Sequence, residues 1–185
     1  MKEIALHALD IIQNSLAAEA SRLQITLDEA GDEITFTVAD NGRGMSPELL
    51  ARVSDPFTTT RTTRKMGLGI PLLRMAAEQT GGWVHLESAL GAGTTLTARF
   101  HSNHIDCPPV GDMGETISLV LQGSPEIELR YTHRLNGQLF FFDTAQVRAQ
   151  LGDGISLALP EVTLWIREYL QEQETILNGQ KGMNL

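Results

Sequence analysis

Two polar side chains near the N-terminus stand at a spacing that suits joint chemistry. Apolar residues recur every three or four positions between residues 2 and 20, which predicts a helix with one buried stripe. Asp10 and Asn14 lie one turn apart on it, and Glu3 and His7 continue the same polar stripe, with His7 expected near a pocket rim. An amide oxygen suits Mg²⁺, and a carboxylate can accept a proton from water or a hydroxyl. Asn14 is therefore a candidate metal ligand and Asp10 a candidate base; an ordinary solvated helix face is the alternative.

The segment DNGRGM at 40–45 follows the second of two alternating runs, 22–29 and 33–39, that predict strands. A carboxylate at the end of a strand, Asp40, could accept a hydrogen bond from an exocyclic amine such as that of adenine. Guanine carries an acceptor at the corresponding edge and would be disfavoured. Glycines let the backbone approach a flat ring, so the candidates for a base pocket are Asp40, Gly42 and Gly44. The alternative is an ordinary turn.

A cationic, hydroxyl-rich stretch precedes a glycine-rich helix start. Residues 55–66 show no periodicity and predict a long loop, which carries Thr58, Arg64 and Lys65. Gly67-Leu68-Gly69 then opens a predicted helix, whose bare N–H groups would attract phosphate. The loop could close over a triphosphate, although the segment is neither a P-loop nor a Rossmann fingerprint. An ordinary helix start is the alternative.

A fourth glycine-rich turn, at 91–93, joins two further predicted strands, 83–88 and 93–100. Its functional interpretation places the hydroxyl of one of the threonines after the turn, Thr94 or Thr95, at the edge of a bound base. Its plain interpretation is an ordinary hairpin.

The order of these segments resembles that of a known family. DIIQNSLAAEA is similar to the N box, DNGRGM to the G1 box, DPFTTT to the F box, MGLGIPLL to the G2 box and GAGTTLTARF to the closing segment. Residues 1–102 thus resemble the ATP-binding domain shared by gyrases, the large heat-shock chaperones, histidine kinases and MutL-type mismatch-repair proteins, the GHKL or Bergerat fold. The resemblance implies an α/β (α+β) two-layer sandwich, in which helices cover one face of a mixed β-sheet.

The resemblance also implies ATP and Mg²⁺ as cofactors and assigns roles to single residues. Asn14 would bind Mg²⁺, Asp40 would bind the adenine amine, and Asp10 stands where the family often has a catalytic glutamate. The full set of candidate cofactor-binding residues is Asn14, Asp40, Gly42, Gly44, Met45, Phe57, Thr58, Arg64, Lys65, Gly67, Leu68, Gly69 and Thr95.

Three functions are compatible with this assignment. The motifs of the resemblance include no helical hairpin with a phosphoacceptor histidine, so we expect a kinase or regulator that acts on a partner protein without its own phosphoacceptor hairpin. The first alternative is an ATP-hydrolysing conformational switch of the mismatch-repair type. The second is a nucleotide-binding module without turnover.

The resemblance does not extend to the residues after 102. Residues 103–114 are predicted to be a linker, and 115–174 a small βββαα extension. Its strands are expected at 117–123, 126–133 and 138–143, and its helices, on which the strands would pack, at 144–151 and 160–174. Residues 175–185 are expected to be a frayed tail.

Composition narrows the classes of partner and compartment. The 185 residues carry a formal net charge of −9, which argues against nucleic-acid and anionic-membrane binders. The chain has one cysteine, no secretory signal pattern and no apolar run of about 20 residues, so we expect a cytoplasmic protein. His101, His104 and Cys107 form a short motif that could hold zinc or iron, although a linker often carries histidine.

Overall fold

The computed structural model describes residues 3–54 and 69–179. Its helices are α1 (Ile4–Ala17), α2 (Pro47–Ser54), α3 (Gly69–Gln79), α4 (Met113–Gly123), α5 (Thr144–Leu151) and α6 (Pro160–Gly179). Its strands are β1 (Arg22–Ala30), β2 (Glu33–Asp40), β3 (Trp83–Ala89), β4 (Gly93–His101), β5 (Glu128–Leu135) and β6 (Gln138–Asp143).

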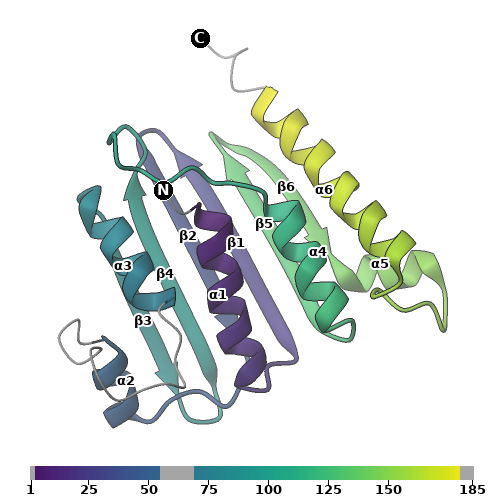
Figure 1. The fold of residues 1–185 in the computed structure, drawn as a ribbon, viewed down its shortest axis with the longest axis horizontal. Coiled ribbons are helices and arrows are strands. Elements are labelled where there is room, and N and C mark those ends of the chain that lie inside the picture. The colour runs from purple at the N-terminus through teal and green to yellow at the C-terminus, as the bar shows by residue number, and fades with distance from the viewer. Residues whose placement is uncertain (1–2, 55–68, 180–185) are drawn as a thin grey trace.

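The six strands form one mixed sheet in the order β3-β4-β2-β1-β5-β6. β1 pairs with β5 in parallel, and every other neighbouring pair is antiparallel. Figure 1 shows α1, α3 and α4 side by side over one face of this sheet, with α6 over its outer end. The predicted two-layer α/β arrangement is therefore confirmed.

Alternation of side chains along the strands places the core on the face that the helices cover. On β1, Leu23, Ile25 and Leu27 are all buried, and Phe36 and Val38 on β2 face the same way. The period-2 pattern that predicted the strands therefore also sets which face becomes apolar. Full burial of a side chain such as Phe36 contributes about 1.5–3 kcal/mol, and such contributions hold the helices against the sheet.

The first turn of α1 is capped by the segment that was expected to be a linker. No side chain caps this helix. Instead, the backbone N–H of Ile4 donates to the carbonyl of Pro109 (3.0 Å), and that of Ala5 donates to the carbonyl of Val110 (2.8 Å). Because the first N–H groups of a helix need partners from outside it, residues 109–110 are tied to the start of α1.

The structure corrects the expectation of a strand at 117–123, because these residues lie in α4. Asp112 caps the helix by accepting from the backbone N–H of Glu115 (2.8 Å). α4 packs against both α1 and α6, and Ile117 and Leu121 are fully buried. A short apolar run fits a strand and a buried helix equally well, and here the cap and the two flanking helices decide for the helix.

The strands after residue 123 extend the sheet of the N-terminal residues instead of packing only on their own helices. β5 lies beside β1 over its whole length, from Arg22 against Glu128 to Glu29 against Leu135. The helix expected at 160–174 continues to Gly179, and Leu177 within it is buried. This corrects the expected fraying for residues 175–179.

None of the helices in the described residues is long and apolar enough to span a bilayer.

Candidate functional site

Asp40 is the centre of a polar cluster at the end of β2. It pairs with Leu23 on β1 and with Thr94 on β4, so its side chain points to the helix-covered face. Its Oδ1 accepts from the backbone N–H groups of Gly42 (2.8 Å) and Thr94 (3.2 Å). Its Oδ2 accepts from the hydroxyl of Ser15 on α1 (2.6 Å). Three donors from three parts of the chain thus fix one half-buried carboxylate.

The three hydrogen bonds leave the carboxylate with capacity for one more donor. An ionised carboxylate offers about four acceptor positions, two on each oxygen. Within the described residues, both positions of Oδ1 are used and one position of Oδ2 is used. Oδ2 of Asp40 is therefore the atom that can accept a hydrogen bond from a ligand.

The predicted glycines after Asp40 let the backbone pass close to its neighbours. A Cβ on Gly42 would lie 2.7 Å from the carbonyl oxygen of Ala18, at the end of α1. Gly44 has φ +68°, and a Cβ on it would overlap the carbonyl of Ala89 at the end of β3. Any other residue would be strained at Gly44. The two glycines therefore allow the loop after β2 to fit closely between the end of α1 and the β3–β4 turn.

Met45 is tied to the same turn through Ser88. Its backbone N–H donates to Oγ of Ser88 (2.9 Å), and the Ser88 hydroxyl donates to the carbonyl of Gly93 (2.9 Å). Ser88 also lies 2.9 Å from the hydroxyl of Thr94. The half-buried side chain of Met45 packs against the core, beside the loop that follows Asp40.

The structure corrects the predicted position of the threonine at the base edge. Thr95 pairs with Ala39 and Glu87, whose side chains point to the uncovered face of the sheet. Thr94 pairs with Asp40 and Ser88 and points to the helix-covered face. Because alternate residues on a strand face opposite ways, only Thr94 shares a face with Asp40.

Asp10 and Asn14 lie on α1 near the start of α3. A Cβ on Gly69 would lie 2.8 Å from Cβ of Asp10, so only glycine allows the two helices to approach this closely. Asp10 and Asn14 are both half-buried. The N–H groups at the start of α3 and its positive dipole end thus lie beside the Asp10 carboxylate.

These residues fit a magnesium nucleotide by their chemistry. Within the described part of the chain, the side-chain amide of Asn14 has no hydrogen-bond partner, so its oxygen is available to a metal ion. The carboxylate oxygen of Asp40, the amide of Asn14 and the helix start at Gly69 suit a base amine, a divalent cation and a phosphate respectively.

Six predicted site residues lie outside the described residues. They are Phe57, Thr58, Arg64, Lys65, Gly67 and Leu68.

His7 does not lie at a rim. Its side chain is only 2% exposed, and it lies among the buried residues of α1 rather than on a polar stripe. Both α3 and α4 pack against α1, so more of the helix surface is covered than the sequence alone predicts.

His101, His104 and Cys107 are not brought together as metal ligands. No group of three metal-binding side chains is positioned to hold an ion anywhere in residues 3–54 and 69–179. His104 Nδ1 instead accepts from the backbone N–H of Asp106 (3.2 Å). The pKa of the Cys107 thiol is raised, first by partial burial and then by the charge of Glu29, which disfavours the thiolate that a metal needs.

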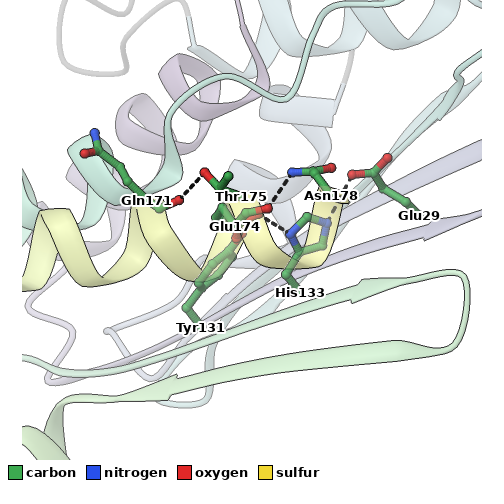
Figure 2. A network of polar contacts seen from close by, with 7 residues as sticks. All are labelled: Glu29, Tyr131, His133, Gln171, Glu174, Thr175 and Asn178. Carbon is green, nitrogen blue, oxygen red and sulfur yellow. Dashed lines mark hydrogen bonds and ion pairs between the residues drawn. The ribbon is translucent and has the colours of Figure 1, made fainter. Parts of the chain in front are cut away.

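A second polar cluster lies under α6, and Figure 2 shows it from close by. His133 on β5 lies between Glu174 on α6 (Nδ1 to Oε2, 2.6 Å) and Glu29 on β1 (Nε2 to Oε1, 3.1 Å). The hydroxyl of Tyr131 donates to Oε1 of Glu174 (2.7 Å). Burial acts to lower the pKa of His133, but the hydrogen bonds to the two carboxylates and their charges outweigh it and raise the pKa to about 9.

Sequence reasoning missed Ser15 and Ser88, which hold Asp40 and Thr94. Ser15 carries one usable signal, since it lies four residues after Ile11 and eight after His7, in a row of α1 that the structure buries. A serine in a buried helical row needs a hydrogen-bond partner, and here the partner is Asp40. Ser88 carries no comparable signal, because its partners come from the loop after β2 (Met45) and from the start of β4 (Gly93 and Thr94).

Comparison with known proteins agrees with this geometry. The family model described as histidine kinase-, DNA gyrase B-, and HSP90-like ATPase matches residues 1–104. The chain is 34% identical over 85 residues to the sensor kinase CckA of Brucella abortus. That alignment covers 45% of this chain and 9% of CckA. It is 36% identical over 97 residues to the histidine protein kinase DivJ of Caulobacter vibrioides. That alignment covers 49% of this chain and 16% of DivJ. The chain thus spans only a small part of these relatives.

A solved structure, that of the N-terminal domain of a DNA repair protein, has the same fold. It aligns with a TM-score of 0.50 and 10% identity, over 76% of this chain and 52% of that one. The family match covers more than half of the chain and includes every predicted motif. The chain therefore belongs to the histidine kinase-, DNA gyrase B- and HSP90-like ATPase family, and residues 1–104 are its ATP-binding, kinase-like domain.

Proposed function

We propose that this protein binds ATP with Mg²⁺ on the helix-covered face of the sheet, at the end of β2, and uses it to phosphorylate a partner protein. The adenine lies against Asp40, and the phosphates extend toward Asp10, Asn14 and the start of α3. The kinase-like domain supports the nucleotide part of the proposal. The names of the relatives, which are sensor kinases, support the transfer to a protein.

One observation carries the choice of nucleotide. Oδ2 of Asp40 has one acceptor position left, while Oδ1 is saturated by Gly42 and Thr94. An exocyclic amine fills that position with a charge-assisted hydrogen bond, which contributes about 1.5–3 kcal/mol. Guanine has a carbonyl at that position. Its oxygen and Oδ2 of Asp40 are both acceptors and would repel each other, so adenine is favoured.

The phosphate end is assigned to three residues. Asn14 would hold Mg²⁺, which when bound neutralises phosphate charge. The N–H groups at the start of the helix, at Gly69, would donate hydrogen bonds to a phosphate, since an α-helix N-terminus is a ready anion site. Asp10 lies against Gly69 and would accept a proton from the attacking hydroxyl or water. Thr58, Arg64 and Lys65 are proposed as further phosphate contacts from residues 55–68.

Hydrolysis of ATP as a conformational switch is the second candidate. Aspartate at position 10 is one methylene shorter than the glutamate that the family often has there. Its place beside the start of α3 still allows it to act on a water molecule. Binding without turnover is the third candidate. The experiment with labelled ATP described below separates all three functions.

The nucleotide itself is tested by calorimetric titration of the purified chain with ADP and with GDP. We expect heat of binding for ADP and at least tenfold weaker binding of GDP. Equal affinities, or no heat with either nucleotide, would contradict the assignment to Asp40.

Turnover is tested with ATP labelled at the γ-phosphate. Transfer to a partner predicts a labelled protein in a cell extract supplemented with the purified chain, and no label with the Asp40→Asn variant. Release of free phosphate by the purified chain alone would favour the switch. Bound nucleotide without either product would leave a binding module.

A further inference from the structure

Ser15 makes the shortest of the three hydrogen bonds to Asp40. Its Oγ lies 2.6 Å from Oδ2, compared with 2.8 Å and 3.2 Å for the two backbone donors to Oδ1. The side chain is 4% exposed, so water does not compete for the hydroxyl. The bond joins α1 to the end of β2, which are 25 residues apart in the sequence.

The single proton of this hydroxyl has one strong acceptor and one weak acceptor. The alternative to Asp40 is the carbonyl of Ile11, one turn earlier in α1, at 3.4 Å. A hydrogen bond to an ionised carboxylate is shorter and about twice as strong as one between neutral groups. The hydroxyl of Ser15 therefore donates to Asp40.

This donor determines how Asp40 can meet a ligand. Gly42 and Thr94 hold Oδ1, but neither contacts Oδ2, so the two backbone donors leave the rotation of the carboxylate plane loosely set. Ser15 occupies one side of Oδ2 and leaves the other side open. Asn14 precedes Ser15 on α1, so the same bond also joins the part of α1 that carries Asn14 to the end of β2.

We propose that Ser15 is a positioning residue for recognition of the exocyclic amine, which orients the free acceptor position of Asp40. The proposal rests on the proposed function, since it needs adenine at Asp40. It assigns to the hydroxyl a share of base discrimination, beyond any contribution to stability.

The test compares two ligands that differ only in the amine, ADP and the 5′-diphosphate of purine riboside. In the Ser15→Ala variant we expect the ADP affinity to fall about tenfold. The affinity for the purine riboside diphosphate should change less than twofold, because that ligand brings no donor to Asp40. The ratio of the two affinities therefore falls about tenfold.

A purely structural role would weaken both ligands equally and leave the ratio unchanged. The Thr116→Val variant is the matched control, since the hydroxyl of Thr116 also donates to α1, to the carbonyl of Ala5 (3.1 Å), and is equally buried. We expect this variant to lower stability without changing the ratio. Ser15→Thr, which keeps the hydroxyl, should restore the ratio.

Ser15→Cys keeps the side-chain volume and replaces the hydroxyl with a weak donor, so it serves if the alanine variant does not fold. It should lower the ratio in the same direction. An unchanged ratio in either folded variant, with normal ADP binding by the wild type, would overturn the role of Ser15 alone. Absence of ADP binding by the wild type would overturn the proposed function as well.

Discussion

Two polar clusters lie on the same face of one sheet, near opposite ends of β1. Asp40 pairs with Leu23 at the start of the strand, and Glu29 of the His133 cluster lies six residues further on, about 20 Å at the usual rise of a strand. Both clusters join helix to sheet through carboxylates. The Asp40 cluster ties α1 to β2, and the His133 cluster ties α6 to β5 and β1.

The clusters differ in what they leave unused. The imidazole of His133 is 1% exposed and both of its nitrogens face carboxylates, while Tyr131 takes the second oxygen of Glu174. Asp40 is half-buried and keeps one acceptor position on Oδ2. The cluster with the strongly shifted pKa is therefore a closed structural connection, and the one that suits a ligand is the incompletely satisfied carboxylate.

The substitution with the largest expected effect on stability is at His133. Replacing it with leucine would remove the cation between the largely covered carboxylates of Glu29 and Glu174, which costs about 3–5 kcal/mol of the free energy of unfolding. ADP affinity of the folded protein should stay within twofold, because Asp40 is remote. Urea unfolding and calorimetry measure the two quantities. His85→Leu, at an exposed position on β3, is the control, and a loss under 1 kcal/mol for His133→Leu would contradict the connecting role.

Alkaline pH should weaken the same connection without any substitution. The folded pKa of His133, about 9, lies above its ordinary value of 6.5, so its stabilising contribution is complete below pH 6.5 and is lost as pH rises through 9. We expect the free energy of unfolding to fall by on the order of 3 kcal/mol between pH 6.5 and 9.5.

The pKa of Tyr131 is raised well above 10, first by burial and then by Glu174, and this adds to the loss above pH 10. Urea unfolding at several pH values measures the decline. The His133→Leu variant should lack the part below pH 9.5, and an equal decline in that variant would contradict this origin.

Asp40→Asn should lower ADP affinity and leave stability almost unchanged, the reverse of the effect expected for His133→Leu. The amide keeps an acceptor for Gly42 and Thr94 but presents no charged oxygen to the amine, so we expect ADP affinity to fall about 100-fold, or about 2.7 kcal/mol. The midpoint of thermal unfolding should move by only a few degrees. Asp28→Asn, half-buried on β1 beside Arg134, is a matched control that should bind ADP normally. Normal ADP binding by Asp40→Asn would refute the pocket.

The two adjacent threonines on β4 give the smallest and sharpest contrast. Thr94→Val removes the hydroxyl on the face of Asp40 and should weaken ADP binding about fivefold, or about 1 kcal/mol. Thr95→Val alters the opposite face and should change it less than twofold. Calorimetric titration of both variants distinguishes them, and the reverse order would mean that the base lies on the other face.

The sequence predicts the N-terminal half of the fold well, because periodicity and turn chemistry agree there. The strands at 22–29 and 33–39 and the hairpin between them follow from strict alternation and from Gly31 in a turn with φ +58°. The run at 117–123 fits two kinds of element, and only contacts with α1 and α6 decide between them.

The sequence predicts which segments form the site, but not which residues of those segments point to the helix-covered face of the sheet. Asp40 follows from its place at the end of a strand, whereas the choice between Thr94 and Thr95 depends on a register of one residue. The burial of His7 depends on which helices cover α1. The row of α1 that holds Ser15 indicates that its hydroxyl needs a partner, but only the packing of α1 against the end of β2 makes that partner Asp40.

A crystal structure of the chain with ADP and Mg²⁺ would test the central claim most directly. We predict the exocyclic amine of adenine within 3.2 Å of Oδ2 of Asp40, with the hydroxyl of Ser15 still bound to the same oxygen. An adenine ring that lies elsewhere, with Asp40 making no contact to it, would contradict the account.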